Sequence, residues 1–510
     1  MCPVVNGVWA HARTTPDKPA LVMGDGVRTF GDLASRAARL AGAFVEAGAE
    51  PATDTPVAVM LPNSMEFFEV AAATARGEMR FLPVNWHLKG DELAYILTDS
   101  GARVLVAAAD LAEHVERGLS GAPDCSVLWV GGDGSYEAAV AESEPRGPEG
   151  WPAPGFMFYT SGTTGRPKGV KHGNTTAERL ELTNAGIAGL WGLTADDVYL
   201  LSGPGYHAGP GGYAFSTLFV GGTVAVLPEW DARAWLAAVE RHRVTATFLA
   251  PAHFIRILEV PDEERAGFDL SSLRLIIHAG APCPISVKHR IIEALPACEV
   301  WELYGMSEGG ASRVSPEEWL ARPGTVGRPW PGVEIRIVGD DGALLPPGQP
   351  GVIYVTPMGG SKFEYHNDRT KTDEAWRDDA FTVGDIGYVD DDGYLYLTDR
   401  ASDMVIRGGV NVYPAEIENA LHEHGDIVDC AVFGVPDERL GERIKAMVET
   451  RRPLSAEEVR AHVRDRLADF KVPDLVEFVD RLPRDPNGKV QKRRLREEHW
   501  KDQPSQVGTA

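Results

Sequence analysis

The sequence predicts an α/β protein: a large N-terminal domain of helix-covered β-sheets plus a small barrel-like part, followed by a small α+β C-terminal domain. Two observations predict this class. Up to about residue 325, apolar runs typical of buried strands alternate with helical periodicities, the pattern of sheets covered by helices. Beyond it, short strands flank turns rich in Gly, Pro and Asp, which is typical of hairpins.

The first elements are a helix, a strand and a second helix. Apolar residues recur at helical spacing in residues 32–49, and Gly48 stands where a C-cap glycine belongs. Residues 57–60 predict a buried strand and residues 67–75 a helix. Residues 142–155 are rich in Pro, Gly and Glu and therefore predict a loop.

Two β-α-β units follow in the middle of the chain. Each places an amphipathic helix between two short apolar strands, the arrangement that covers a sheet with helices. The strand, helix and strand are expected at residues 223–227, 231–243 and 245–249 in the first unit, and at 273–277, 284–295 and 299–303 in the second.

The last third of the chain changes pattern twice, first to hairpins and then, from Pro414, to a smaller alternation of helices and strands. We therefore expect two domains, 1–400 and 401–510, with frayed residues at 503–510. The hairpin strands are expected at 333–338 with 352–356 and 388–389 with 394–397; the C-terminal elements are helix 414–424, strands 428–433 and 445–450, helix 456–470 and strand 476–479.

Composition and charge exclude several classes of protein. The 510 residues carry 50 basic and 74 acidic side chains, a formal net charge of −24. Nucleic acid is therefore not an expected partner, because phosphate neutralisation needs clustered Lys and Arg. Five scattered cysteines predict reduced thiols rather than disulfides or a zinc cluster. Without a signal-like N-terminus or an apolar run of roughly 18 residues, we expect a cytoplasmic protein with no transmembrane segment.

The most informative segment is residues 160–169, Thr-Ser-Gly-Thr-Thr-Gly-Arg-Pro-Lys-Gly, which follows a strand-like run at 155–159. Its glycines let backbone N–H groups approach a ligand, its hydroxyls donate to phosphate oxygens, and Lys168 supplies charge. We interpret it as a phosphate-binding loop; the alternative is a solvated turn. It is not a Walker A loop, and a Rossmann site is disfavoured because Glu137 replaces the third glycine after Gly132 and Gly134.

Residues 305–309, Gly-Met-Ser-Glu-Gly, fit the nucleophile elbow of α/β-hydrolases and follow a predicted strand. However, no amphipathic helix opens after Gly309, and no oxyanion segment precedes the pattern. A hydrolase is therefore disfavoured, and neither a catalytic Ser/His/Asp set nor a metal cluster is expected.

Five segments, in order along the chain, resemble motifs of the adenylate-forming (AMP-binding) superfamily, and within it the acyl-CoA synthetases of the fatty-acyl or aryl CoA ligase type. The resemblance implies a mobile C-terminal domain and a ligase that joins a carboxylate to coenzyme A through an acyl-adenylate, using ATP and Mg²⁺. The segments are residues 160–169, residues 304–308, Gly384-Asp385, Asp399-Arg400 with Gly408-Gly409 and 413–416, and residues 483–489; weaker matches lie at 92–93 and 97–100.

The resemblance assigns the nucleotide site, where catalysis should rest on positioning and charge neutralisation. Glu308 would hold Mg²⁺ through its carboxylate oxygens, and Ser307, in place of the usual Thr, would donate to the α-phosphate. Tyr304 would stack on adenine, while Asp385 and Arg400 would meet the ribose. The other ATP- and AMP-binding candidates are Thr160, Ser161, Gly162, Thr163, Thr164, Lys168, Gly280, Ala281, Pro282, Glu302 and Leu303.

The resemblance also assigns roles in the C-terminal domain. Lys489 would bridge the carboxylate and the α-phosphate in the first step; the alternative is a solvated basic tail. The domain would then rotate about Ser402 and open a tunnel for coenzyme A. The coenzyme A-binding candidates are Gly408, Gly409, Phe470 and Lys471.

Three positions depart from the family pattern. Ser402 stands where Asp or Lys is usual, Glu302 where an amide commonly meets adenine, and Val383 in place of the Thr of a T-G-D motif. They leave open an enzyme that is efficient in only one half-reaction, the thioesterification of a supplied acyl-adenylate.

The acyl pocket is expected near Tyr206 and His207. His207 is counted with the catalytic candidates Lys489, Glu308 and Ser307, as a gate or wall of the pocket rather than a base; a packed core histidine is the alternative. Residues 208–212 are poor in side chains, which leaves room and predicts a bulky or long apolar acid rather than acetate. The pocket candidates are Tyr206, His207, Gly211, Tyr213, His253 and Ala279, with Trp191 as a further wall. For Trp191, Tyr213 and His253, a place in the core is an equal alternative.

The expected function is an acyl-CoA ligase whose partners are a small carboxylic acid, ATP and coenzyme A; a homodimer is left open. A stand-alone adenylation enzyme that loads a carrier protein shares the same first-step motifs and differs only in the acceptor. A non-catalytic adenylate-binding protein is disfavoured, because Lys489 and Glu308 are both present.

Overall fold

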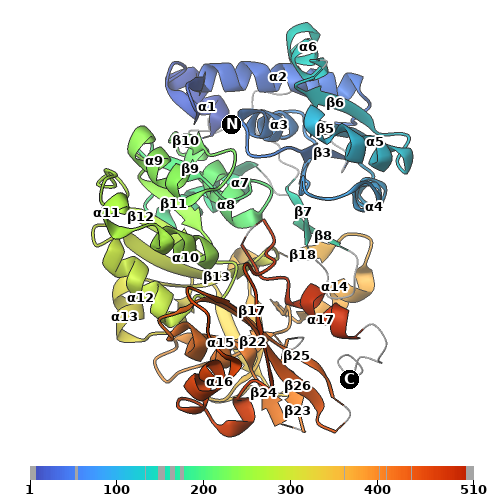
Figure 1. The fold of residues 1–510 in the computed structure, drawn as a ribbon. Helices are drawn as coiled ribbons and strands as arrows, with labels where there is room; N and C mark the ends of the chain where they lie inside the picture. Colours follow the sequence, from blue (N-terminus) through green and yellow to red (C-terminus); the bar gives the residue numbers. More distant parts are fainter. Residues whose placement is uncertain are drawn as a thin grey trace. The chain divides into compact units, whose positions relative to one another are not determined.

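The computed structural model describes residues 7–51, 55–132, 134–146, 155–160, 167–172, 177–360, 362–400, 403–408, 410–437, 439–486 and 488–500. Figure 1 shows the chain as a ribbon. The chain divides into two compact units, each discontinuous in sequence. Unit 1 contains residues 1–248, 266–275 and 361–374, and unit 2 contains residues 249–265, 276–360 and 375–510. Among the described residues, no helix is both long and apolar enough to cross a membrane.

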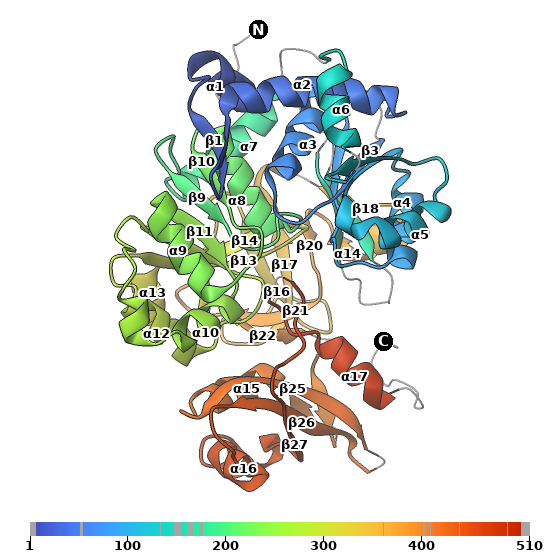
Figure 2. The ribbon, with the colours of Figure 1, turned by 45° about the horizontal axis from the view of Figure 1, so that its top comes forward.

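A parallel four-stranded sheet lies near the start of unit 1. Its strands, in the order β4-β3-β5-β6, are buried where they meet α4 and α5, through Leu93, Ile96 and Val115. Helices α2, α3 and α6 lie on the opposite side of this sheet (Figure 2). The elements are α2 Phe30–Glu46, β3 Pro56–Met60, α3 Met65–Arg76, β4 Arg80–Pro83, α4 Gly90–Ser100, β5 Val104–Ala108, η1 Ala109–Leu111, α5 Ala112–Ser120, β6 Ser126–Val130 and α6 Ser135–Glu142.

Unit 1 contains two further sheets. One has the order β11-β9-β10-β1-β2, and α8 and α9 contact its strand β9. The other is antiparallel, with the order β18-β8-β7. The elements are α1 Val8–Thr14, β1 Pro19–Met23, β2 Gly26–Thr29, β7 Met157–Thr160, β8 Lys168–His172, α7 Ala177–Leu190, β9 Val198–Leu201, α8 Ala208–Phe219, β10 Thr223–Val226, α9 Ala232–His242, β11 Ala246–Leu249, β18 Phe363–Tyr365 and α14 Arg369–Ala375.

The first part of unit 2 is a long, mostly antiparallel sheet in the order β19-β20-β17-β21-β22-β15-β14-β13-β12, with β16 paired to β17. The elements are α10 Pro251–Glu259, α11 Asp262–Arg265, β12 Leu275–His278, α12 Ile285–Ala294, β13 Glu299–Met306, β14 Gly309–Val314, α13 Pro316–Ala321, β15 Thr325–Pro329, β16 Glu334–Val338, β17 Gly351–Thr356, η2 Met358–Gly360, β19 Trp376–Arg377, β20 Ala380–Phe381, β21 Asp385–Val389 and β22 Leu395–Arg400.

The C-terminal part of unit 2 is built on the long β25–β26 hairpin, with β23 antiparallel and β27 parallel to β26. Alternate residues face two cores, so both faces of the sheet are covered: α15 and α16 pack on Val432 and Val448, and α17 packs on Phe433. The elements are β23 Val405–Arg407, β24 Val410–Val412, α15 Pro414–His422, β25 Ile427–Asp437, β26 Gly441–Thr450, α16 Ala456–Arg464, η3 Asp469–Lys471, β27 Leu475–Phe478 and α17 Lys492–Trp500.

The mixed α/β class and both β-α-β units are confirmed, as are the two hairpins, β16–β17 and β21–β22. The helix predicted over 456–470 is too long, since α16 ends at Arg464 and a 3₁₀ turn follows at Asp469–Lys471. The basic run at 492–494 opens helix α17, which the sequence analysis did not predict. Residues 305–309 cross a β-hairpin rather than a strand-to-helix turn, so they form no nucleophile elbow.

Candidate active site

The two ends of the predicted phosphate-binding loop are held by a strand pair in unit 1. Strands β7 and β8 are antiparallel, with Thr160 opposite Lys168, so the loop closes on these two residues. The Lys168 ammonium lies 4.8 Å from the centre of the Tyr365 ring, and the Tyr95 hydroxyl donates to the Pro167 carbonyl at 3.2 Å. Ser161, Gly162, Thr163 and Thr164 lie outside the described residues.

Tyr206 and His207 precede helix α8, also in unit 1. Their rings lie 4.7 Å apart, and His207 Nε2 is buried without a hydrogen-bond partner among the described residues. Burial lowers the pKa of His207 to about 4, so its imidazole is neutral at pH 7. An imidazole with so low a pKa is a weak base, so His207 suits a pocket wall better than a general base. Tyr213 contacts the Trp191 and Phe248 rings, each at 5.9 Å between centroids.

The three glycines within residues 208–212 differ in what surrounds them. A Cβ on Gly211 would lie 2.2 Å from the Gly205 carbonyl oxygen, and one on Gly209 would lie 2.8 Å from the Phe248 ring. These two glycines therefore permit close packing and open no space. Only Gly212 of this group faces open space, with nothing within 4 Å of an added Cβ. The expectation that the whole segment leaves room for the acid is thus limited to Gly212.

In unit 2, the predicted adenine and ribose residues meet. The Tyr304 hydroxyl, on β13, donates to Asp385 Oδ2, on β21, at 2.8 Å, and both side chains are buried. Arg400 lies opposite Asp385 in the β21–β22 register. The two-residue turn between β13 and β14 consists of Ser307 and Glu308. The residues assigned to the α-phosphate and to Mg²⁺ therefore lie in the turn that directly follows the strand of Tyr304.

Glu302 is engaged by a residue that the sequence analysis missed. Its Oε2 lies 2.6 Å from Lys288 Nζ on α12 and 3.6 Å from His278 Nε2, and Lys288 is fully buried. Burial raises the pKa of Glu302, while the Lys288 ammonium acts in the opposite direction. The sequence contains one indication of this ion pair: Lys288 lies on the otherwise apolar face of a predicted helix, and a buried cation needs a partner. Gly280, Ala281 and Pro282 follow β12, and Gly280 has a φ of +92°.

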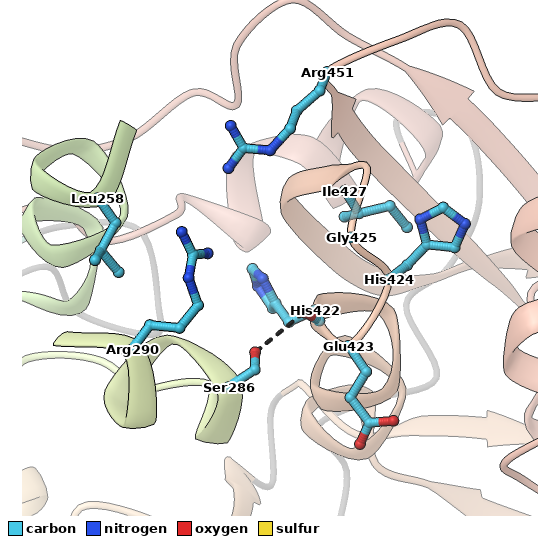
Figure 3. Close-up of a pocket in the computed structure, with 9 residues that line it drawn as sticks. All are labelled: Leu258, Ser286, Arg290, His422, Glu423, His424, Gly425, Ile427 and Arg451. Carbon is cyan, nitrogen blue, oxygen red and sulfur yellow. Dashed lines mark hydrogen bonds between the residues drawn. The ribbon is translucent and has the colours of Figure 1, made fainter. Parts of the chain in front are cut away.

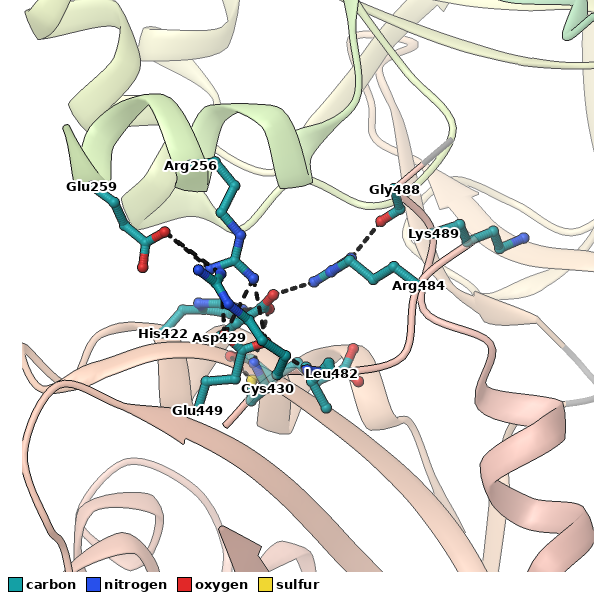
Figure 4. Close-up of polar contacts among 12 residues, drawn as sticks. Arg256, Glu259, His422, Asp429, Cys430, Glu449, Leu482, Arg484, Gly488 and Lys489 are labelled. Carbon is teal, nitrogen blue, oxygen red and sulfur yellow. Dashed lines mark hydrogen bonds and ion pairs between the residues drawn. The ribbon is translucent and has the colours of Figure 1, made fainter. Parts of the chain in front are cut away.

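His253 lies at the first turn of α10. Its Nδ1 accepts a hydrogen bond from the Ala250 N–H at 3.0 Å. Burial and, less strongly, the Arg484 guanidinium lower the pKa of His253 to about 3. The loop that carries Lys489 lies against the same turn, since a Cβ on Gly488 would be 3.0 Å from Ala252 Cβ (Figure 4).

The coenzyme A candidates share one region of the C-terminal part. Arg407, next to Gly408, donates to the Phe470 carbonyl at 3.1 Å, and Lys471 pairs with Glu416 at 2.6 Å. Phe470 is 40% exposed. Gly409 and the predicted hinge Ser402 lie outside the described residues.

A hollow of about 360 Å³ lies between α10, α12 and the residues that follow α15 (Figure 3). Arg290 and Arg451 point toward it, and burial together with Arg451 lowers the pKa of Arg290. None of the predicted site residues lines it. Its lining residues are Leu258, Ser286, Arg290, His422, Glu423, His424, Gly425, Ile427 and Arg451.

Comparison with known proteins identifies the family. Residues 8–360 match the family described as AMP-binding enzyme, and residues 416–489 match the AMP-binding enzyme C-terminal domain. Feruloyl-CoA synthase of an Amycolatopsis species is 36% identical over 500 residues, which cover 96% of this chain and 98% of that protein. Fatty acid–[acyl-carrier-protein] ligase ScoC of Streptomyces coeruleorubidus is 32% identical over 509 residues, with 98% and 96% covered.

A solved structure agrees with these matches. The anthranilate CoA ligase AuaEII in complex with anthranoyl-AMP superposes with a TM-score of 0.87 at 25% identity and covers 98% of each chain. The two family matches together span most of the sequence, in the order that the motifs predict. The chain therefore belongs to the AMP-binding enzymes, the adenylate-forming superfamily, and within it to the CoA ligase type.

Proposed function

We propose that this enzyme activates a bulky or long apolar carboxylic acid with ATP and transfers the acyl group to coenzyme A. The observation that carries the proposal is the Tyr304–Asp385 hydrogen bond on the strand that leads into the Ser307–Glu308 turn. It supports one contiguous site for adenine, ribose and the α-phosphate, which is what an adenylate needs.

In the first step, a carboxylate oxygen of the acid attacks the α-phosphorus of ATP, and pyrophosphate leaves. We assign Ser307 as the donor to the α-phosphate, and Lys489 as the cation that bridges this phosphate and the carboxylate. Thr160, Lys168 and the loop between them hold the departing phosphates. The Glu308 carboxylate would hold Mg²⁺, a hard cation that prefers oxygen ligands, and the ion would supply positive charge against the phosphates.

In the second step, the thiol sulfur of coenzyme A attacks the carbonyl carbon of the acyl-adenylate, the bond from this carbon to the phosphate oxygen breaks, and AMP leaves while the thiol proton passes to water. Gly408, Phe470 and Lys471 are proposed to contact coenzyme A, with the exposed Phe470 ring available for stacking. The Glu416 carboxylate neutralises part of the Lys471 charge and fixes the direction of its side chain.

Two of the three departures from the family pattern have local compensations. Lys288 balances the charge of Glu302. Thr382, one residue before Val383, accepts the Gly384 N–H at 3.1 Å and so supports the turn that presents Asp385. We therefore propose that both half-reactions are efficient.

The preference for an apolar acid is supported by the aromatic surroundings of Tyr213 and by the open space at Gly212. Relatives named for feruloyl and fatty acyl groups agree with it. The test uses purified protein with ATP, Mg²⁺ and a panel of acetate, octanoate, benzoate and a hydroxycinnamate, with and without coenzyme A. Mass spectrometry then measures acyl-AMP and acyl-CoA separately. Acyl-CoA from the larger acids is expected, and turnover of acetate alone would contradict the proposed specificity.

A second candidate acceptor is a carrier protein, favoured by the similarity to the acyl-carrier-protein ligase. The same assay separates the two, because a carrier-loading enzyme would accumulate acyl-AMP from the larger acids and form no acyl-CoA. A phosphopantetheinylated carrier added to that reaction would then become acylated.

A further inference from the structure

The turn that carries Lys489 is fixed by its own backbone. Asp485 and Lys489 face each other across it: the Asp485 N–H donates to the Lys489 carbonyl, and the Lys489 N–H donates to Asp485 Oδ1, each at 2.8 Å. Gly488 has a φ of +82°, and its N–H donates to the Asp485 carbonyl at 2.8 Å. The position of the Lys489 side chain therefore depends on where this turn is anchored.

Arg484 provides the anchor. One terminal nitrogen of its guanidinium donates to the Gly488 carbonyl, directly before Lys489, and the other donates to the Asp429 carboxylate on β25 (Figure 4). The Asp429 side chain is only 2% exposed, and its Oδ1 also accepts the Cys430 N–H at 2.9 Å. The Arg484 side chain thus ties the turn to β25 through a buried carboxylate.

We propose that Arg484, held by Asp429, is a positioning residue for Lys489 in acyl-adenylate formation. Arg484 bonds to backbone and carboxylate and acts on the reaction only through the turn. The inference rests on the proposed role of Lys489, and it adds that Arg484 determines the position of the Lys489 side chain. Since a displacement of about 1 Å can lower a rate by about 100-fold, the anchor matters even though the turn has its own hydrogen bonds.

Arginine is required at this position because two acceptors must be met at once. The planar guanidinium presents donors at both ends, to the carbonyl on one side and to the carboxylate on the other. An ammonium at residue 484 could retain the charge pair with Asp429, but as a point charge it could not hold both acceptors in this geometry. Arg484→Lys therefore keeps the charge of the buried pair and removes the anchor.

The experiment compares the two half-reactions in each variant. Acyl-AMP formation is followed by pyrophosphate release, and thioester formation is followed from supplied acyl-AMP and coenzyme A. We expect Arg484→Lys and Asp429→Asn to lower acyl-AMP formation by about 10- to 100-fold and to change thioester formation by less than about twofold. Arg493→Lys is the matched control, because Arg493 is exposed and pairs with Glu497 within α17.

The outcomes separate this inference from the proposed function. Lys489→Ala should abolish acyl-AMP formation and spare thioester formation; loss of both or of neither would overturn the assigned role of Lys489. If Lys489→Ala behaves as expected while the Arg484 and Asp429 variants lose both half-reactions equally, or neither, then Arg484 is not a positioning residue. Should Arg484→Lys fail to fold, the isosteric Asp429→Asn decides.

Discussion

Tyr304 has two roles: its ring is proposed to stack on adenine, and its hydroxyl holds the Asp385 carboxylate. The hydroxyl donates to a buried carboxylate, and hydrogen bonds to charged groups contribute about 1.5–3 kcal/mol. Tyr304→Phe keeps the ring and removes the donor, so Asp385 loses a fixed orientation. We expect the KM for ATP to rise by about 10-fold or more. Tyr388→Phe is the same change on β21, the strand that carries Asp385; it is the control and should leave the KM within about twofold.

His207 leads to a prediction about pH. Its pKa, about 4 in the folded protein, lies below the usual 6.5, so the unfolded state binds more protons between these values. This residue's contribution to stability is complete above about pH 6.5 and is lost as the pH falls toward 4. His207→Asn should make the fall in melting temperature over this range shallower, measured by thermal unfolding from pH 4 to 8. An unchanged slope would show that the imidazole is not buried as a neutral group.

At the scale of elements, one buried ion pair joins α12 to β13. Lys288→Met leaves the Glu302 carboxylate buried without its cation, which costs about 3–5 kcal/mol in the free energy of unfolding. The double variant Lys288→Met/Glu302→Gln should regain much of this loss, because no unpaired charge remains. Urea titration measures both. Arg117→Gln breaks the exposed pair with Asp91 and should cost less than about 1 kcal/mol; an equal cost for both single variants would contradict the argument.

The same element scale shows what sequence periodicity can and cannot predict. The helix over 231–243 and the strand over 57–60 were placed within two residues of α9 and β3, because the helical apolar periodicity and the continuous apolar run of the strand determine them locally. Helix α17 was not predicted, because only Leu495 of its nine residues is buried and its other residues give no apolar periodicity. The helix packs on Phe433 through Leu495 and forms ion pairs from Lys492 and Arg496 to Glu418 and Glu442, contacts that no local sequence pattern predicts.

For the whole molecule, the motifs assign roles to single residues, and the structure adds the contacts that surround those residues. The Tyr304 and Asp385 roles came from the resemblance, and the structure adds their hydrogen bond. Lys288, Asp429 and Arg484 could not be paired with their partners from the sequence, because Asp429 and Arg484 are 55 residues apart. Gly211 was interpreted as open space but is required by a close backbone approach, a distinction that only three-dimensional packing makes.

Ion pairs between α10 and the C-terminal β-sheet lead to the last prediction. Arg256 bridges Glu259 of its own helix at 3.0 Å and Glu449 of β26 at 3.2 Å, and Glu449 also accepts the Leu482 N–H. We propose that the C-terminal domain rotates between the two half-reactions, so these contacts favour the arrangement that contains them.

Arg256→Gln should therefore lower acyl-AMP formation several-fold while leaving thioester formation from supplied acyl-AMP unchanged or faster, since only one of the two arrangements loses a contact. Arg290→Gln is the control: Arg290 lines the neighbouring hollow in Figure 3 and makes no side-chain hydrogen bond or ion pair to a described residue. High salt should reduce the difference between Arg256→Gln and the unmodified enzyme, because it weakens the same ion pairs. Equal loss of both half-reactions in Arg256→Gln would mean that these ion pairs stabilise the fold and do not select an arrangement.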